Sequence, residues 1–268
     1  MFIGDGANGK SVVLAVLAAM LGLDNTVSIS LHQLGDKFQT GRLRGKVANI
    51  VGDLEDTDKV TEGLLKQLVS GERVKGEFKN RDPFTFVTRA RHTFSANSFQ
   101  RFRDRTNGIW RRVLLFVFDQ IVPEEKRDVN LAKDLIRDEL PGIFNWALKG
   151  ARRLQAQGGA FTPSAVCERE FKRYRVDCNP VAAFLAECCN VAEGLNIRKQ
   201  SLYQTYKEWC DNNSYKALAS SSFGRELNRV VPGLREVRPR VEGERVNEYV
   251  GIELRDRVSV IRSSRWAS

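Results

Sequence analysis

The chain has 268 residues, enough for one large domain or two modest ones. Its hydrophobic content of 42% supports a buried core, and its apolar run Val12–Leu21 is shorter than the roughly 20 residues that cross a membrane. Because that run lacks a basic leader, we expect neither a signal peptide nor a membrane partner. We therefore expect a protein of the cytoplasm. The net charge of +10 suits a polyphosphate partner, although an uninvolved basic surface explains it equally well.

The five cysteines show no spacing typical of a metal site. They form no CxxC pair, and the two histidines, His32 and His92, are not close to them in sequence. We therefore expect buried, reduced thiols in a cytosolic protein rather than a zinc site.

The first half of the chain has the pattern of an α/β fold. An almost wholly apolar helix is expected from Ser11 to Leu21, and Gly22 ends it. Short apolar runs typical of buried parallel strands occupy 27–30 and 47–51. Further along we expect a helix from about residue 61, a β-hairpin with its tip at 79–82, and strands at 91–97 and 111–118.

The second half is predicted to be helical, with a small mixed domain at the end. Residues 123–174 have a helical pattern, and Asp177–Pro180 are typical of a domain boundary. Later elements are expected to be helices at 181–191, 202–210 and 223–231, a strand near 195–197, and two strands flanking the turn at 242–243. The predicted domains are 1–122, 123–178 and 179–255, followed by a basic tail, 256–268.

The segment GDGANGKS matches the phosphate-binding pattern G-x-x-x-x-G-K-[ST]. Its glycines let backbone N–H groups turn toward phosphates, the lysine reaches the β- and γ-phosphates, and the serine hydroxyl binds Mg²⁺. A plain glycine turn can show the same pattern, but here it lies between an apolar pair and an apolar helix, the order that this chemistry needs. The predicted ATP-binding residues are Gly4, Asp5, Gly6, Ala7, Asn8, Gly9, Lys10 and Ser11.

Polar residues follow two of the predicted strands. An ATPase of this type needs a carboxylate after a neighbouring strand to hold Mg²⁺, and Asp53 is our candidate, together with Ser11. Glu55 is the candidate for polarising the attacking water. Asn97 is a candidate for orienting that water, although turns favour asparagine for ordinary reasons.

Arg111 and Arg112 lie at the start of the strand predicted at 111–118. Such a pair is either a solvated ion-pair partner or an arginine finger. A finger reaches from one subunit into the ATP site of the next and stabilises the charge of the transition state. Both residues are therefore candidates for catalysis.

The order of these motifs resembles that of superfamily 3 helicases. The segments are GDGANGKS, ANIVGDLED, LLKQLVSGERVKGEFKNRDPFTF, FSAN and GIWRR, and ELPGIFNWALKG continues the similarity. The helicase part of phage and plasmid primase-helicases, which is related to poxvirus-type helicase-primases, is the most similar. FLAECC, LYQTYKEWCDNN and SFGRELNR resemble the winged-helix tail of the same proteins.

The resemblance implies a P-loop AAA+-type ATPase domain of the α/β class, a helical extension and a small C-terminal winged-helix domain. It also implies hexameric rings that use ATP and Mg²⁺ to unwind DNA from 3′ to 5′ during phage or prophage replication in the cytoplasm of a bacterial host. For individual residues, the resemblance implies the roles given above for Lys10, Ser11 and Asp53. It also implies that Asn97 is the sensor and that Arg112, with Arg111 as the alternate, is the trans-acting finger.

DNA-binding residues are also implied by the resemblance. The family's basic hairpin grips single-stranded DNA, which here points to Lys79 and Arg81 with Phe78 as a stacking partner, unless this is an ordinary hairpin. In the helix 223–231, Arg225 and Arg229 lie off the apolar face, which suits the major groove of duplex DNA and equally an ordinary surface helix. Whether this tail binds DNA or protein is open.

Two features depart from the family pattern. Gly52 precedes Asp53 where many members have adjacent acids, so the catalytic base is open. Only Met1–Ile3 precede the glycine loop, so we expect a helicase motor that lacks its front segment and has no primase function. One alternative is a truncated, weakly catalytic remnant that serves as a DNA-binding or assembly module. Another is an ATPase that loads or packages DNA without unwinding it.

Overall fold

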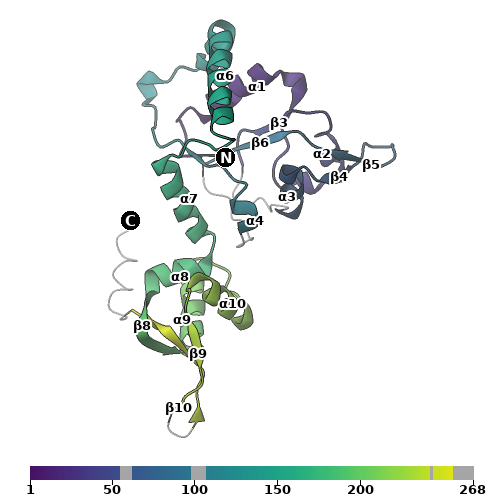
Figure 1. The fold of residues 1–268 in the computed structure, drawn as a ribbon. Coiled ribbons are helices and arrows are strands. Elements are labelled where there is room, and N and C mark those ends of the chain that lie inside the picture. The colour runs from purple at the N-terminus through teal and green to yellow at the C-terminus, as the bar shows by residue number, and fades with distance from the viewer. Residues whose placement is uncertain (55–61, 98–106, 242–243, 256–268) are drawn as a thin grey trace. The chain divides into compact units, whose positions relative to one another are not determined.

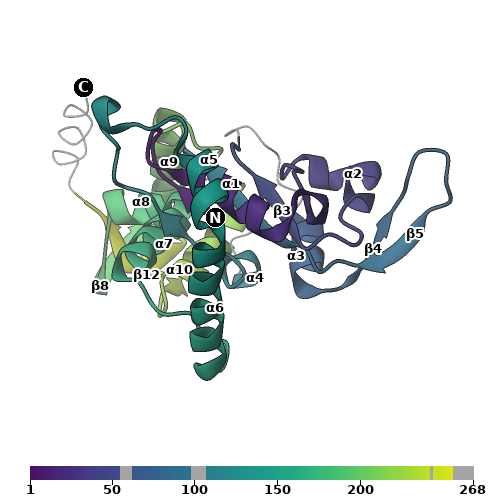
Figure 2. The same ribbon diagram turned by 90° about the horizontal axis from the view of Figure 1, so that it is seen from above.

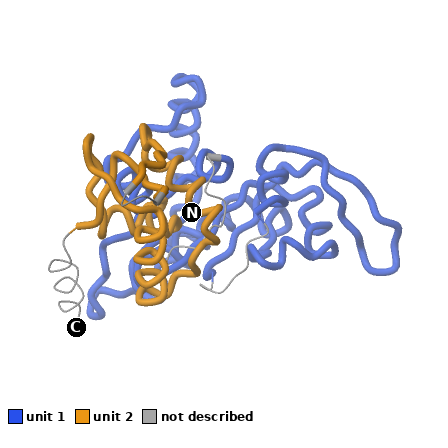
Figure 3. The backbone as a smooth tube through the Cα atoms, turned by 90° about the horizontal axis from the view of Figure 1, so that it is seen from below, with its two compact units in different colours: residues 1–174 blue, residues 175–268 orange. Residues whose placement is uncertain are grey.

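A computed structural model gives the fold and describes residues 1–54, 62–97, 107–241 and 244–255. The chain divides into two compact units, residues 1–174 and 175–268 (Figures 1 and 3). Unit 1 is a mixed α/β structure built on a parallel sheet, which confirms the α/β class predicted for the first half of the chain.

The sheet of unit 1 has its first strand in an inner position. The strands are β1 (Phe2–Ile3), β2 (Thr26–Val27), β3 (Ala48–Val51), β6 (Arg91–Ala96) and β7 (Phe116–Val117). They lie in the order β2-β3-β6-β1-β7, and every neighbouring pair is parallel. Because carboxyl ends of parallel strands share one edge, the segments that follow β1, β3 and β6 converge there.

Two strands are shorter than predicted because other groups satisfy their backbones. The strand expected at 27–30 ends at Val27, since the side-chain amide of Asn49 accepts from Ile29 N at 2.8 Å and donates to Ile29 O at 2.9 Å. The strand expected at 111–118 begins only at Phe116. Before it, helix α4 (Asn107–Trp110) ends in a turn in which Arg112 N donates to Ile109 O at 2.9 Å.

Helices pack against this sheet through the apolar positions that the sequence indicated. Helix α1 (Lys10–Leu21) is the first element after β1, and helix α3 (Glu62–Ser70), which confirms the helix predicted from about residue 61, buries Leu65 and Leu68. The helical pattern at 123–174 is also confirmed. It contains α5 (Leu131–Asp134), a π-helical turn (Leu135–Glu139), α6 (Leu140–Ala156) and α7 (Ala165–Asp177), and α6 lies beside α1 (Figure 1).

A β-hairpin projects from unit 1 (Figure 2). It consists of β4 (Arg73–Gly76) and β5 (Phe84–Val87), so the predicted hairpin and its tip at 79–82 are confirmed. The end of β4 next to the turn packs on helix α2 (Lys37–Gly41), where a Cβ atom on Gly76 would lie 2.7 Å from the Cα atom of Gly41. Two glycines are thus needed where the hairpin meets the body.

The described part of unit 2 combines helices with a small antiparallel sheet. After the end of α7, its helices are α8 (Pro180–Cys188), α9 (Lys199–Asn212) and α10 (Ser220–Val230). The strands are β8 (Cys189–Arg198), β9 (Arg235–Val237), β10 (Arg240–Val241), β11 (Glu244–Arg245) and β12 (Glu248–Leu254). The main sheet has the order β8-β12-β9, and β10 pairs with β11.

One predicted boundary in unit 2 is wrong. The helix expected at 181–191 ends at Cys188, because Cys189 and Val191 pair with Leu254 and Ile252 of β12. The strand expected near 195–197 is confirmed as the end of β8, and strands flank residues 242–243 as predicted. The turn residues 242–243 themselves and the predicted tail 256–268 lie outside the described residues.

The core of unit 2 contains aromatic residues and three cysteines. Phe184, Tyr206 and Phe223 lie in contact, with ring centroids 5.5 and 4.5 Å apart. Burial raises the pKa of the Cys188 thiol to about 11 and that of Cys189 to about 12, so both stay protonated at neutral pH. Among the described helices of the whole chain, none is long and apolar enough to span a membrane.

Candidate functional site

The loop Gly4–Gly9 joins β1 to α1, and its first and last residues require glycine. Gly4 has φ +156°, and a Cβ atom there would lie 2.0 Å from the carbonyl oxygen of Phe118. Gly9, directly before α1, has φ +86°, a left-handed conformation that other residues rarely adopt. The first glycine thus lets the loop lie against the segment after β7, and the second turns it into the helix.

The segment after β7 holds this loop by hydrogen bonds. Asn8 Nδ2 donates to the carbonyl oxygen of Phe118 at 2.9 Å, and Val122 N donates to that of Ala7 at 2.8 Å. Phe118 N in turn donates to Ile3 O at 2.7 Å. No signal in the motif indicates these partners, because Phe118 lies 110 residues from Asn8 in sequence.

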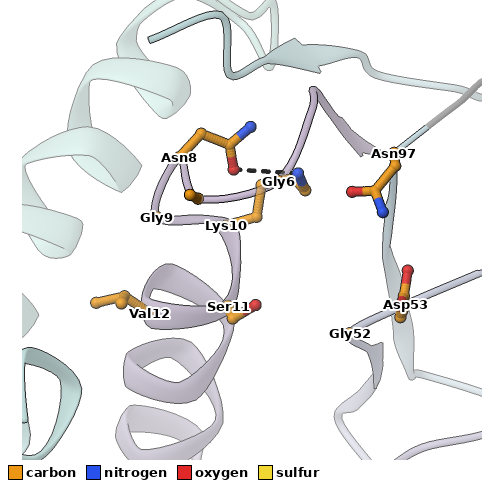
Figure 4. A pocket seen from close by; sticks show the side chains of 10 residues that line it. Gly6, Asn8, Gly9, Lys10, Ser11, Val12, Gly52, Asp53 and Asn97 are labelled. Carbon is orange, nitrogen blue, oxygen red and sulfur yellow. Dashed lines mark hydrogen bonds between the residues drawn. The ribbon is translucent and has the colours of Figure 1, made fainter. Parts of the chain in front are cut away.

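Lys10 is the first residue of α1 and is only 6% exposed. Its Nζ donates to the backbone oxygens of Gly4 at 2.5 Å and Asp5 at 2.9 Å, and to Asn8 Oδ1 at 3.0 Å (Figure 4). Burial lowers the pKa of Lys10, and the nearby charges of Asp5 and Asp53 oppose this shift. All three acceptors are neutral oxygens, so among the described residues no carboxylate is hydrogen-bonded to the ammonium group.

Asp53 and Asn97 follow the neighbouring strands β3 and β6. Leu54 N donates to Ser95 O at 2.9 Å, and the Leu54 side chain is buried, which fixes the turn that carries Asp53. Asp53 and Asn97 are both exposed. Because β3, β6 and β1 are parallel, both residues lie at the edge of the sheet where the glycine loop begins.

A cavity of about 500 Å³ at this edge brings together residues from three strand ends (Figure 4). Across it, Ser11 on α1 faces Asp53 and Asn97. The lining residues are Gly6, Ala7, Asn8, Gly9, Lys10, Ser11, Val12, Gly52, Asp53 and Asn97. Gly4 and Asp5, the first residues of the loop, are not among these lining residues, and their backbone oxygens accept hydrogen bonds from Lys10. Val12 and Gly52 are not among the site residues predicted from the sequence. The signal that could have indicated them is their position next to Ser11 and Asp53.

The groups around the cavity fit a polyphosphate and a hard divalent cation. The first N–H groups of α1 have no acceptor within the helix and carry the positive partial charge of its N-terminus. The Ser11 hydroxyl and the Asp53 carboxylate are oxygen ligands of the kind that Mg²⁺ prefers. Glu55, the candidate for polarising water, lies outside the described residues.

The arginine pair lies in the turn after α4 and does not line this cavity. The guanidinium group of Arg112 donates to Ser70 Oγ at 2.8 and 3.2 Å and also to Gly108 O. Arg112 therefore ties α4 to the end of α3 within one chain. Arg111 is exposed.

The hairpin tip, also separate from this cavity, carries two exposed basic residues, Lys79 and Arg81. Phe78 is half-buried and packs on Phe84, with ring centroids 5.0 Å apart. The guanidinium group of Arg44 lies 4.9 Å from the centre of the Phe84 ring. The predicted stacking residue thus belongs to a packed aromatic row, whereas the two basic residues are accessible.

The two arginines predicted on α10 are both exposed but differ in their partners. Arg225 Nη2 donates to Ser222 Oγ at 3.3 Å. Arg229 donates to Glu226 Oε1 at 2.7 Å, and this nearly buried carboxylate also accepts from Asn179 Nδ2 at 2.6 Å. Arg229 is therefore paired with a nearly buried carboxylate, whereas Arg225 contacts only a serine hydroxyl among the described hydrogen bonds.

Two family models match this chain. A family of unknown function (DUF5906) matches residues 2–112, and the family described as Poxvirus D5 protein-like matches residues 177–258. The putative helicase 121R of Invertebrate iridescent virus 3 is 22% identical over 245 residues, covering 78% of this chain. The chain spans 26% of the length of that relative.

Solved structures similar to the chain include the C-terminal region of NrS-1 in its apo A form. It has a TM-score of 0.48 and 10% identity, over 93% of this chain and 66% of that one. The JCV helicase with a bound substituted acetamide has a TM-score of 0.37 and 13% identity, over 69% of this chain and 54% of that one.

The family matches and the viral relative place the chain among helicase-related proteins. More specifically, the chain is related to superfamily 3 helicases of the poxvirus-type helicase-primase group, as the order of its sequence motifs predicted.

Proposed function

We propose that this chain is the ATP-dependent DNA helicase motor of a phage or prophage replication protein. The observation that carries the proposal is the cavity in which Lys10, Ser11 and Asp53 meet Asn97 at one edge of a parallel sheet. Those residue types in that arrangement suit phosphoryl transfer, in which the protein positions phosphates, a metal ion and water. The proposed fold of unit 1 is accordingly a P-loop ATPase of the AAA+ type.

Each side chain has a role in this proposal. Lys10 exchanges some of its neutral oxygen acceptors for phosphate oxygens, and the N–H groups of the glycine loop and of the first turn of α1 bind the same phosphates. Ser11 and Asp53 hold Mg²⁺, which when bound neutralises charge on the transferring phosphoryl group. Asn97 orients the attacking water, and Glu55 is the proposed group that polarises it.

We further propose a homo-hexameric ring with ATP sites at subunit interfaces. In such a ring one of the two arginines after α4 reaches the neighbouring subunit's ATP. Arg112 already bonds to Ser70 within its own chain, whereas Arg111 is exposed. Either Arg112 leaves Ser70 when the ring assembles or Arg111 serves as the finger, and the two cases are separable by mutation.

Two further surfaces are proposed to bind DNA. Lys79 and Arg81 at the hairpin tip would contact single-stranded DNA in the ring. Unit 2 would be a winged-helix domain, with β10 and β11 as the wing and Arg225 on α10 facing duplex DNA. Because Arg229 is paired with Glu226, it would contribute less to DNA binding than Arg225 does.

The central experiment measures ATP hydrolysis by the chain with and without single-stranded DNA. We expect stimulation by the DNA, and a loss of at least about 100-fold in hydrolysis when Lys10→Ala removes the buried ammonium group. Lys149→Ala, at an exposed position on α6, is the matched control and should hydrolyse ATP normally. Equal hydrolysis with and without DNA would contradict the motor assignment, and stimulation without strand displacement would favour a loader or packaging ATPase.

Mixed rings identify the arginine finger. Arg111→Ala subunits mixed with Lys10→Ala subunits should recover part of the activity, because some interfaces then combine an intact loop with an intact arginine. The same mixture is made with Arg112→Ala. Recovery with one of the two variants identifies the finger, and recovery with neither contradicts a trans-acting arginine.

A second function is favoured by the separate core of unit 2. A chain that serves only as a DNA-binding or assembly module would bind duplex DNA in a salt-sensitive way, indifferent to ATP and to Lys10→Ala. If the unmodified chain bound DNA in this way and did not hydrolyse ATP, the DNA-binding or assembly function would replace the motor proposal.

A further inference from the structure

Unit 2 contains a cavity of about 310 Å³ where the first turns of α9 and α10 meet β9 and β12. Its lining residues all belong to unit 2, so it is separate from the cavity at the glycine loop. Its volume is at the lower end of the range found for sites of small molecules. Polar side chains from all four elements line it, and such walls suit a polar or ionic ligand.

Tyr249 on β12 places an unpaired hydroxyl group in the wall of this cavity. The residue is only 4% exposed, yet its hydroxyl makes no hydrogen bond with a described residue. The hydroxyl is not sealed inside the core, because the buried side-chain atoms that lack a partner among the described residues are His92 Nε2 and Ser95 Oγ. Burial, with a smaller contribution from Glu236, raises the pKa of Tyr249, so the hydroxyl keeps its proton and can donate it. An acceptor in the cavity would satisfy this donor.

Gly224 allows the Tyr249 hydroxyl to lie against α10. A Cβ atom at Gly224 would be 3.0 Å from the hydroxyl oxygen, so a larger residue there would crowd it. Glycine inside a helix costs about 1 kcal/mol relative to alanine, and here the missing side chain leaves room for the hydroxyl. Ser220 and Ser221 lie one turn earlier on the same side of the helix. The Tyr249 donor is therefore close to the N-terminus of α10.

The N-terminus of α10 adds unpaired donors at the same wall. Ala219 precedes the helix and offers no side-chain cap. The backbone N–H groups of Ser220 and Ser221 have no acceptor among the described residues, and both serines line the cavity. Unpaired N–H groups at a helix N-terminus carry positive partial charge and bind anions.

The charged side chains around the cavity leave this wall positive. The carboxylate of Glu236 is already occupied, because it accepts from Lys199 Nζ and, at 3.3 Å, from Asn228 Nδ2. The hydrogen bond from Lys199 lowers the pKa of Glu236, so this pair stays ionised and neutral overall. Arg225 is exposed and lines the cavity without a carboxylate partner among the described residues. Its charge is therefore available to an anionic ligand.

We propose that this cavity is a binding site for a phosphate group, supplied by a nucleic-acid strand or by a free nucleotide. The phosphate oxygens accept from Ser220, Ser221 and the Tyr249 hydroxyl, and Arg225 provides the compensating charge. A phosphate suits these donors better than a planar carboxylate, because its oxygens are arranged tetrahedrally and the donors come from a helix end, a strand and an arginine. The site is independent of the proposed ATP site. Where a DNA strand supplies the phosphate, the site rests on the DNA-binding role proposed for unit 2.

Tyrosine NMR on the full chain tests the site directly. The chain has five tyrosines, of which Tyr249 and Tyr203 line this cavity. The tyrosines carry an NMR-active label at the ring carbon that bears the hydroxyl group. Titration with inorganic phosphate should shift the signals of Tyr249 and Tyr203 and leave those of Tyr174 and Tyr215 unchanged. If neither of the first two signals moves, the proposal is overturned.

Three variants test the assigned donors. Tyr249→Phe removes only the hydroxyl, and it should weaken phosphate binding at least about tenfold, as the loss of one hydrogen bond to a charged group predicts. The Tyr203 signal follows this titration, and Arg225→Ala should give a similar loss. Lys207→Ala removes the same charge from an exposed position on α9 outside the cavity, and it should bind as the unmodified chain does. Full binding by Tyr249→Phe, or an equal loss in Lys207→Ala and Arg225→Ala, overturns the proposal.

Two further titrations, with adenosine monophosphate and with a short DNA duplex, identify the source of the phosphate. The source is whichever of the two shifts the Tyr203 and Tyr249 signals at the lower concentration, and Tyr249→Phe should weaken that ligand's binding. If neither shifts them, inorganic phosphate is an adventitious ion only, and the proposal is overturned. None of these measurements depends on ATP hydrolysis, so their failure leaves the motor proposal intact. Duplex binding that Tyr249→Phe does not change leaves the DNA-binding role of unit 2 intact and excludes this cavity from it.

Discussion

Gly4 lies where two backbone segments almost touch, and it shows how a motif residue depends on a distant segment. The motif requires glycine here so that the backbone can turn toward an anion. The structure gives a second reason, because the carbonyl oxygen of Phe118 lies 2.0 Å from where a Cβ atom would be. Gly6, in the same loop, has no atom within 4 Å of that position. The two glycines are therefore required to different degrees.

Gly4→Ala should lower the free energy of unfolding of unit 1 by about 2–4 kcal/mol, because the loop must move away from Phe118. Gly6→Ala, the control within the same loop, should change it by no more than about 0.5 kcal/mol. Thermal unfolding followed by calorimetry compares the two variants. Equal destabilisation by both would show that Phe118 does not constrain the loop.

His92 should make the stability of unit 1 depend on pH. Its pKa in the folded chain, about 4, is below the ordinary value of 6.5, so on acidification the unfolded chain takes up the proton first. This contribution is fully present above pH 6.5 and is lost as the pH falls toward 4. Between pH 7 and pH 5 the free energy of unfolding should fall by about 2 kcal/mol more in the unmodified chain than in His92→Gln. Parallel urea titrations at the two pH values measure this difference, and equal losses would contradict it.

At the scale of elements, side chains determine where helices and strands begin and end. Asn49 ends β2 with its amide, and Asn179 begins α8 by accepting from Val181 N at 3.1 Å and Ala182 N at 3.4 Å. Pro180 follows at the first helical position, where its missing N–H costs nothing. Residues 177–180 therefore form the N-terminal start of α8, which explains why their composition is typical of a turn.

Asn179→Ala should destabilise unit 2 by about 2–3 kcal/mol, since it removes the cap of α8 and one of the two groups that hold the buried Glu226. Asn212→Ala, at an exposed position near the end of α9, should cost less than about 0.5 kcal/mol. Urea denaturation followed by tryptophan fluorescence, which reports on the buried Trp209, distinguishes them. If Asn179→Ala lowered the free energy of unfolding as little as the control does, Arg229 alone would be sufficient as the hydrogen-bond partner of Glu226.

At the scale of the whole molecule, each unit contains the residues of its own proposed activity. The described residues that line the cavity at the glycine loop all belong to unit 1, and the aromatic core of unit 2 is formed by α8, α9, α10 and β12. Unit 2 should therefore fold without unit 1.

Residues 175–255 expressed alone should unfold cooperatively, with a heat-capacity change of about 1 kcal/mol/K. Dispersed amide signals in an NMR spectrum provide the second measurement. A broad transition with poorly dispersed signals would show that the core around Tyr206 and Phe223 needs residues of unit 1.

The sequence predicted the local features well because local residues cause them. The sequence predicted a helix from about residue 61, which is α3, and a hairpin with its tip at 79–82, which is β4–β5. The positions of Asp53 and Asn97 after two predicted strands indicated that both lie near the glycine loop. The predictions were wrong where a segment distant in sequence determines the local secondary structure. The last three residues of the helix predicted at 181–191 pair instead with β12, which lies about sixty residues further on.

The sequence by itself determined the class of fold, the motif order of a superfamily 3 helicase relative and the residues of the loop at Gly4–Ser11, since these depend on residue type and spacing along the chain. Only the tertiary structure decided that Phe118 holds this loop, that Arg112 bonds to Ser70 while Arg111 is exposed, and that Arg229 is paired with Glu226. It also buries His92 beside Asn49, and this burial lowers the pKa of the imidazole to about 4 and keeps the ring neutral. The physical reason is common to all four: a hydrogen bond or ion pair across the fold depends on which distant groups packing brings within about 3 Å, and spacing along the chain does not contain that information.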